Sequence, residues 1–395
     1  MSPVALPPDL DALFALTADR IHRAAAEEWP DEPVTLGAHI PSVTGYVRRM
    51  HVSGREVIAK DSVLGLSLVS VLRGVAGDGD QVRAGQAAYA TSPTSLLARE
   101  AAQLRAMDAA GIRVARCVGF RHGVLFTEAV TGPSLLDLIV KDPTRTACLM
   151  SGAVRGLDRL QAPSVVAVAD GSPIAERGIG STFHRKFNGI SGRTYVQRLG
   201  ADQLDERTRR GAVAVLSTVI ARLLKLRLTP TPDPRLVVYG DLKPEHVLFP
   251  EGPDERPVFI DPGLSRGASH TDPAKLASRA LLTLIATPPL DDVTAVAAGI
   301  DAFTRAESGC RPPAARALWL RRLMVTWLMD TVNILSTYLA APSALPLPEH
   351  ARAVVDSTPA LCTVLDSVSA TLAAGTDPEA TWRLALASVT RAATR

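Results

Sequence analysis

Two acidic turns, each preceded by a short apolar run, are the most chemically informative features of the sequence. The first is Gly240-Asp241, after Val237-Val238-Tyr239, and the second is Asp261-Pro262-Gly263, after Phe259-Ile260. Each apolar run predicts a strand that ends in a turn presenting one carboxylate. Two carboxylates placed in this way are typical of a site that binds a metal ion and phosphate groups.

Lysine is rare in this chain, so a lysine beside a predicted strand is informative. Lys60 ends the strand-like run Val57-Ile58-Ala59, and Lys243 lies two residues after Asp241. Glu100 lies inside the helix-forming segment 96–109. A lysine at a strand end and a glutamate on an amphipathic helix usually face solvent when they occur alone. Their occurrence in one chain with the two acidic turns favours a functional role for both.

Composition limits the class of protein. A chain of 395 residues is long enough for two lobes, and 47% hydrophobic with 21% charged residues indicates a globular protein. A net charge of +3 on 43 basic and 40 acidic residues argues against a dedicated nucleic-acid binder. The four cysteines show no C-x-x-C spacing, which predicts neither a zinc site nor a disulfide framework and fits a reducing cytoplasm.

Targeting and membrane signals are not found. The first residues lack the basic and then apolar regions of a signal peptide. The apolar segment 317–341 contains Arg321, Arg322, Asp330 and Asn333, so a buried helix is predicted there and not a membrane span. Together these features predict a cytoplasmic protein.

The residue pattern divides the chain into two predicted lobes, 1–128 and 129–395, of an α+β fold. The first lobe is predicted to hold a leading helix at 9–29, antiparallel strands at 34–37, 45–52, 56–60, 114–120 and 123–127, and helices at 64–75 and 96–109. The second is predicted to be mostly helical, with helices at 134–140, 144–160, 204–226, 273–285, 292–305, 314–339 and 348–372, the last split at Pro359.

The order of these features resembles the protein-kinase-like superfamily, and most closely its aminoglycoside phosphotransferase branch of small-molecule kinases. The resemblance covers about residues 34–284 and depends mainly on 239–248 and 259–263. It implies a bilobal fold, with an antiparallel sheet and a helix in the N-terminal lobe. It also implies a phosphotransferase that uses ATP and Mg²⁺, with Mn²⁺ as the alternative metal, and a small-molecule hydroxyl as acceptor. Phosphoryl transfer needs neutralisation of phosphate charge and a base near the attacking hydroxyl.

The resemblance implies a role for each motif residue. Asp241 would be the base that orients the acceptor hydroxyl, and Lys243 would approach the transferred phosphate. Asp261 would bridge the metal and phosphate oxygens. Lys60 would contact the α- and β-phosphates and pair with Glu100.

Two further segments are implied to bind the nucleotide. The segment 37–46 lacks a G-x-G-x-x-G pattern and resembles the serine-containing loops of small-molecule kinases. Either the hydroxyls of Ser42 and Thr44 contact the β-phosphate there, or the segment is an ordinary hairpin turn. Glu128 to Val130 resembles the hinge that binds adenine through its main chain.

Two residues depart from the family pattern. Pro262 replaces a large side chain and stiffens the second acidic turn, which favours a constitutively active enzyme. His246 replaces an asparagine that binds a second metal ion, and imidazole suits softer metals than Mg²⁺. His246 therefore ligates a metal, or orients Asp241 by a hydrogen bond, or marks a degenerate site; these three interpretations stay open.

The acceptor and the function class also leave alternatives. Asp330 and the basic, aromatic segment 183–188 are acceptor-site candidates, although an internal hydrogen-bonding role and a solvated loop are the commoner interpretations. The run Asp241-Leu242-Lys243-Pro244-Glu245 also occurs in serine/threonine protein kinases, but no A-P-E-like segment follows Asp261. A pseudokinase acting as a regulatory module is the third hypothesis, motivated by His246 and Pro262.

Overall fold

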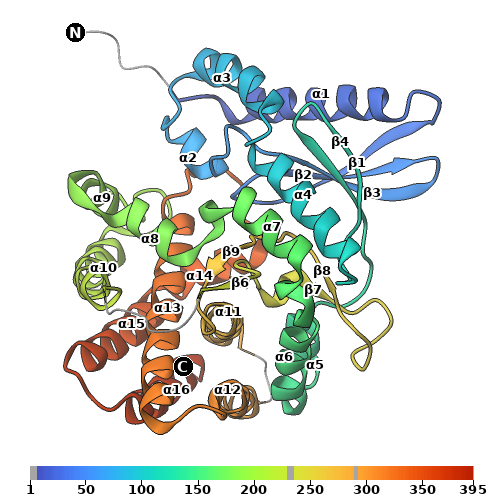
Figure 1. Ribbon diagram of the computed structural model, residues 1–395. Coiled ribbons are helices and arrows are strands. Elements are labelled where there is room, and N and C mark those ends of the chain that lie inside the picture. The colour runs from blue at the N-terminus through green and yellow to red at the C-terminus, as the bar shows by residue number, and fades with distance from the viewer. Residues whose placement is uncertain (1–6, 229–234, 289–291, 395) are drawn as a thin grey trace. The chain divides into compact units, whose positions relative to one another are not determined.

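The computed structural model describes residues 7–228, 235–288 and 292–394, and the chain divides into two compact units. Unit 1 contains Met1–Val130 together with Ala341–Pro348. Unit 2 contains Thr131–Ala340 together with Glu349–Arg395. Figure 1 shows the elements of both units in chain order.

Unit 1 contains a five-stranded antiparallel sheet in the order β1-β2-β3-β5-β4. Its strands are β1 (Val34–Ile40), β2 (Tyr46–Val52), β3 (Arg55–Asp61), β4 (Cys117–Arg121) and β5 (Val124–Glu128). The β2–β3 hairpin turns at Ser53 and Gly54, which both have positive φ, as a two-residue turn of this kind requires. The predicted antiparallel sheet is thereby confirmed.

The helices of unit 1 are α1 (Leu10–Glu28), α2 (Leu68–Leu72), α3 (Gly79–Thr91) and α4 (Leu96–Ala109). Of these, α1 and α4 pack on the sheet. The core joins Ile21 and Ala24 of α1 to Met50 and Phe126 of the sheet, all fully buried. The sequence predicted α4 with the bounds that the structure has. It did not predict α3, although Asp78 and Gln81 form the capping box that begins this helix.

Unit 2 is mostly helical, as predicted. Its helices are α5 (Leu135–Lys141), α6 (Thr146–Arg155), α7 (Pro163–Gly171), α8 (Ile179–Phe187), α9 (Gly189–Gln197), α10 (Glu206–Leu226), α11 (Thr271–Ala286), α12 (Val293–Ser308), α13 (Pro313–Leu339), α14 (Glu349–Asp356), α15 (Thr358–Ala373) and α16 (Pro378–Ala393). Most residues of α11 and α13 are buried, and these two helices pack against each other in the core. Pro359 lies in the first turn of α15, where proline is tolerated, so the predicted split is present.

The interpretation of residues 183–188 as a solvated loop is wrong. Residues 183–187 belong to α8, in which Phe183 and Phe187 are buried one turn apart with ring centroids separated by 4.8 Å. Lys186 Nζ donates hydrogen bonds to Asn333 O at 2.8 Å and Thr337 Oγ1 at 2.5 Å on α13. The glycines at 178, 180 and 189 disfavour a helix in the sequence, so the apolar face formed by Phe183 and Phe187 was not predicted.

Four short strands carry the two acidic turns of unit 2. They are β6 (Leu236–Val238), β7 (Val247–Leu248), β8 (Val258–Phe259) and β9 (Ser265–Gly267). β6 pairs with β9, and β7 pairs with β8, both antiparallel. Within the described ranges, no helix is both long and apolar enough to span a membrane.

Candidate active site

The two acidic turns of unit 2 are joined by backbone hydrogen bonds. Gly263 N donates to Tyr239 O at 2.9 Å, and Ile260 N donates to His246 O at 3.0 Å. Gly240 has φ +79°, and a Cβ at this position would collide with the carbonyl oxygen of Gly263. Only glycine fits both the backbone angle and the close approach, so the fold requires a glycine at position 240, directly before Asp241.

Asp272, at the start of α11, fixes the backbone before Asp241. Its Oδ2 accepts a hydrogen bond from Tyr239 N and its Oδ1 accepts one from Gly240 N, both at 2.8 Å. Burial raises the pKa of Asp272 to about 6, against the opposing effect of these two hydrogen bonds. The sequence analysis did not assign a role to this residue. In the sequence, the only signal was an acidic residue directly before the helix predicted at 273–285.

Asp241 is buried and lies between two lysine ammonium groups. Lys243 Nζ lies 2.8 Å from Asp241 Oδ2, and Lys275 Nζ lies 3.3 Å from Asp241 Oδ1. Burial alone would raise the pKa of Asp241, but the two ammonium groups outweigh it and hold this pKa well below its usual range. Asp241 is therefore ionised at neutral pH and able to accept a hydrogen bond.

Lys275 is shared between Asp241 and a second buried carboxylate. Its Nζ lies 2.6 Å from Asp330 Oδ1, and Ser278 Oγ donates to Asp330 Oδ2 at 2.8 Å. Asp330 is only 2% exposed. The structure thus gives Asp330 the internal hydrogen-bonding role. The sequence analysis missed Lys275, which α11 brings next to the turn.

Lys243 has an unusual environment for a lysine. Burial lowers its pKa to about 8, against the attraction of Asp241, which acts in the opposite direction. Its side chain retains 19% exposure, more than that of Lys275 at 6%. Lys243 is therefore the more accessible of the two cations beside Asp241.

Asp261 adopts a backbone conformation that is rare for residues other than glycine, with φ +59°. Such a conformation persists only where neighbouring groups impose it, and it is common at functional sites. Here Tyr239 Oη donates to Ile260 O at 2.6 Å, and Arg177 Nη1 donates to Pro262 O at 2.5 Å. These two bonds hold the residues on both sides of Asp261.

His246 lies between the two aspartates. Its Nδ1 is 3.9 Å from Asp241 Oδ2, and its Nε2 is 3.6 Å from Asp261 Oδ2. Both distances exceed hydrogen-bond length. The interpretation of His246 as a direct hydrogen-bonding orienter of Asp241 finds no support in this geometry.

The side chains beside the two acidic turns offer part of the ligand shell of a divalent metal. In the described part of the chain, no three histidine, cysteine or acidic side chains converge on a possible metal position. Magnesium, however, is usually held by one or two protein carboxylates, with the remaining positions filled by substrate phosphates and water. The carboxylate of Asp261, 27% exposed beside His246 Nε2, fits that partial shell.

In unit 1, Lys60 and Glu100 form an ion pair. Lys60 Nζ lies 2.9 Å from Glu100 Oε1, and the side chains are 13% and 0% exposed. Lys60 lies on β3 opposite Leu125 of β5, and Glu100 lies on α4. The residues between them form α2 and α3, which accounts for their long separation in the sequence.

The other predicted nucleotide contacts of unit 1 have local partners. Ser42 Oγ accepts hydrogen bonds from Thr44 N at 3.2 Å and Gly45 N at 3.4 Å, and lies 3.2 Å from Thr44 Oγ1. Glu128 forms an ion pair with Arg116 at 2.5 Å. Val130 is the last residue of the first segment of unit 1, Met1–Val130. Ser42 and Thr44 thus form a self-bonded turn between β1 and β2.

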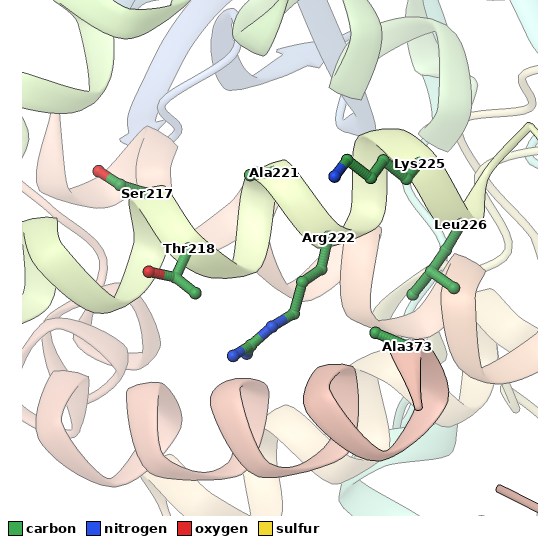
Figure 2. A pocket seen from close by; sticks show the side chains of 7 residues that line it. All are labelled: Ser217, Thr218, Ala221, Arg222, Lys225, Leu226 and Ala373. Carbon is green, nitrogen blue, oxygen red and sulfur yellow. The ribbon is translucent and has the colours of Figure 1, made fainter. Parts of the chain in front are cut away.

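The hollow drawn in Figure 2 lies elsewhere in unit 2, between α10 and α15, with a volume of about 620 Å³. Its lining residues are Ser217, Thr218, Ala221, Arg222, Lys225, Leu226 and Ala373. Arg222 points from α10 toward α15, where its Nη1 lies 2.6 Å from Asp366 Oδ1. No residue of the two acidic turns lines this hollow, so it is not the candidate active site.

Comparison by sequence finds neither a matching protein-family model nor a matching curated protein. Solved structures are similar in fold. An amicoumacin kinase, hAmiN, in complex with AMP-PNP, Ca²⁺ and Ami is 13% identical with a TM-score of 0.50, covering 92% of this chain and 96% of that chain. The aminoglycoside phosphotransferase APH(4)-Ia is 11% identical with a TM-score of 0.48, covering 89% and 98%.

At this level of identity, the similarity concerns the fold. The match to the amicoumacin kinase extends over most of both chains, and this chain has the antiparallel sheet and the mostly helical part that the sequence predicted. The resemblance stated from the motifs is confirmed at this level. The chain has the protein-kinase-like fold of small-molecule kinases.

Proposed function

We propose that this protein is a phosphotransferase that uses ATP and Mg²⁺ to phosphorylate a hydroxyl group of a small molecule, an antibiotic or a metabolite. The observation that carries the proposal is the cluster in unit 2, where buried Asp241 lies between two lysines and next to the turn of Asp261. The fold similarity to a kinase described in complex with AMP-PNP and Ca²⁺ supports nucleotide and divalent-metal binding.

Asp241 is the base of the proposed reaction. It accepts a hydrogen bond from the acceptor hydroxyl and orients the oxygen toward the γ-phosphorus. It takes up the proton as the new phosphorus–oxygen bond forms and the bond from the γ-phosphorus to the bridging oxygen breaks, which releases ADP. Because its pKa is well below the usual range, Asp241 is a weak base. Most of its contribution is therefore orientation, with proton uptake late in a loose transition state.

Lys243, Asp261 and His246 act on the transferred phosphate in this proposal. The ammonium of Lys243 moves from Asp241 Oδ2 to a phosphate oxygen and neutralises charge there. Asp261 would hold the metal through its carboxylate, and His246 would be a second ligand through its Nε2. A bound Mg²⁺ would supply charge neutralisation for the β- and γ-phosphates.

The residues of unit 1 bind the rest of the nucleotide in this proposal. Lys60, held by Glu100, contacts the α- and β-phosphates. Main-chain groups of Glu128 and Val130 bind adenine. The turn of Ser42 and Thr44 contributes backbone donors to the β-phosphate, because the Ser42 hydroxyl already accepts bonds within the turn.

The test is transfer from labelled ATP in the presence of Mg²⁺ to a panel of hydroxylated metabolites and antibiotics. The expected result is one or more phosphorylated products that the Asp241→Asn variant does not form. Asp366→Asn is a matched control, because it removes a carboxylate of unit 2 that pairs with Arg222 on another face. The proposal would be contradicted if the wild-type protein showed no Asp241-dependent turnover and bound no nucleotide.

The two alternative functions, protein kinase and pseudokinase, require different features of the chain. A protein kinase needs an activation segment after the metal turn, but the chain passes from Asp261 through β9 directly into α11 at Thr271. A pseudokinase needs only nucleotide binding. Thermal unfolding with ATP, with and without Mg²⁺ or Mn²⁺, separates it from an enzyme: stabilisation by ATP that metal does not increase would favour the pseudokinase.

A further inference from the structure

We propose that Lys275 is a positioning residue that holds Oδ1 of Asp241, so that Oδ2 is the oxygen that receives the acceptor hydroxyl, and that Asp330 in turn holds Lys275. The inference rests on the proposed function, in which Asp241 is the base. It concerns how one carboxylate oxygen is made inaccessible while the other is kept available.

The geometry distinguishes the two oxygens of Asp241. Oδ1 faces Lys275, whose side chain is 6% exposed, and beyond it Asp330, whose side chain is 2% exposed. Oδ2 faces Lys243, which is 19% exposed, and the ring of His246 at 3.9 Å. Oδ1 therefore points to the protein interior, and Oδ2 points to the side that a substrate can reach.

The position of the Lys275 ammonium is set by two packed helices. Lys275 and Ser278 lie on α11, and Asp330 lies on α13, the helix against which α11 packs. Ser278 Oγ bonds Asp330 Oδ2, which leaves Asp330 Oδ1 for the 2.6 Å contact with Lys275. A charged group held by rigid elements in this way can fix the rotamer of its neighbour at little cost during the reaction.

Lys243 is unsuited to do this alone. In the proposed reaction its ammonium must leave Oδ2 to contact the transferred phosphate. If Lys275 did not hold Oδ1, the Asp241 carboxylate would be free to rotate at the step that requires its orientation. Lys275 thus allows Lys243 to move without loss of the base position.

The alternative is that Lys275 only neutralises the buried charge of Asp330. A buried ion pair can often be replaced by apolar side chains of similar size without loss of stability, whereas removal of one partner is strongly destabilising. The double variant Lys275→Met/Asp330→Leu therefore removes both buried charges together. It separates the two roles, because it restores charge balance in the core but leaves Asp241 Oδ1 without Lys275.

The experiment measures phosphate release from ATP in the presence of Mg²⁺, with water as the acceptor, together with thermal unfolding. For Lys275→Met we expect a lowered Tm and a lowered kcat. For the double variant we expect a Tm near that of the wild type and a KM for ATP within about twofold of the wild type. We expect its kcat to be reduced about 100-fold, because a correctly positioned general base contributes about this factor to the rate. Arg222→Met/Asp366→Leu, which removes a more exposed ion pair between α10 and α15, is expected to keep the wild-type kcat.

A folded double variant with wild-type kcat would overturn the inference, since it would show that Lys275 only balances Asp330. If neither Lys275 variant folds, Asp330→Asn provides the test, because the amide keeps the size and the bond from Ser278. A folded Asp330→Asn protein is expected to lose about tenfold in kcat at unchanged KM, and full activity would overturn the role of Asp330. Phosphate release by the wild type that Asp241→Asn does not reduce would instead refute the proposed function itself.

Discussion

Lys60 Nζ lies 2.9 Å from Oε1 of Glu100, whose side chain has no exposed surface. The pair connects β3 to α4 within unit 1, although 40 residues separate its members. A carboxylate buried this completely needs a compensating charge, so the lysine is held at a defined point at the end of its strand. The ion pair therefore places a cation, with 13% of its side chain exposed, beside the sheet.

Glu100→Gln is expected to weaken nucleotide binding more than it weakens the fold. The amide keeps the volume and one hydrogen bond but not the charge that fixes Lys60. We expect the rise in Tm that saturating ATP produces to be at least halved, with a smaller change in the Tm of the free protein. Glu56→Gln, which removes an exposed pair with Arg49 on the same sheet, is the control. An ATP-induced shift equal to that of the wild type would show that Glu100 has only a structural role.

The pKa of Lys243 predicts an alkaline limit of activity. Burial lowers this pKa to about 8, so the side chain is charged below that pH and loses its charge as the pH rises through it. The kcat/KM for ATP, which reports the ionisation of groups in the free enzyme, is therefore expected to fall with a midpoint near pH 8. In Lys243→Arg the guanidinium stays charged, and the decline should move to higher pH whatever the absolute rate. Alkaline limbs that coincide in the two proteins would contradict the assignment.

His246→Asn tests the metal-ligand interpretation. An amide oxygen is a better ligand for Mg²⁺ than imidazole, and Mn²⁺ accepts a nitrogen ligand more readily than Mg²⁺ does. Mg²⁺-dependent activity is expected to be kept or raised, and the ratio of Mn²⁺- to Mg²⁺-dependent rates is expected to fall. Titration of each metal at saturating ATP gives both values. Total loss of activity with either metal would mean that the imidazole does something other than bind it.

Replacement of two glycines of unit 2 by alanine is expected to change stability in opposite directions. Gly240→Ala forces a side chain into the left-handed region and against the carbonyl of Gly263, so we expect a loss of about 3 kcal/mol or more in the free energy of unfolding. Gly211→Ala lies in α10 with open space around the added carbon, and a gain of about 0.5–1 kcal/mol is expected. Denaturant unfolding of both variants measures the difference. Equal stabilities would show that the turn before Asp241 is not constrained as described.

Much of the fold could be predicted because its signals are local. The Ser53-Gly54 turn marks a hairpin, and the apolar spacing of 96–109 marks a helix, without knowledge of distant residues. The same holds for Asp241 and Asp261, which follow strands in the sequence itself. The roles of Asp272 and Lys275 could not be predicted, because they depend on how α11 packs beside the turn. Arg177, which bonds Pro262 O, lies even farther from its partner in the sequence.

The division of the chain also limits how the protein can be dissected. Unit 1 includes Ala341–Pro348, so the chain passes between the units after residues 130, 340 and 348. A fragment that ends at Val130 lacks eight residues belonging to its own compact body, and a fragment that starts at Thr131 carries those residues without the rest of that body. Gene fragments made by a single cut near residue 130 are therefore poor substitutes for the separate units. Experiments on either unit are better done in the intact chain.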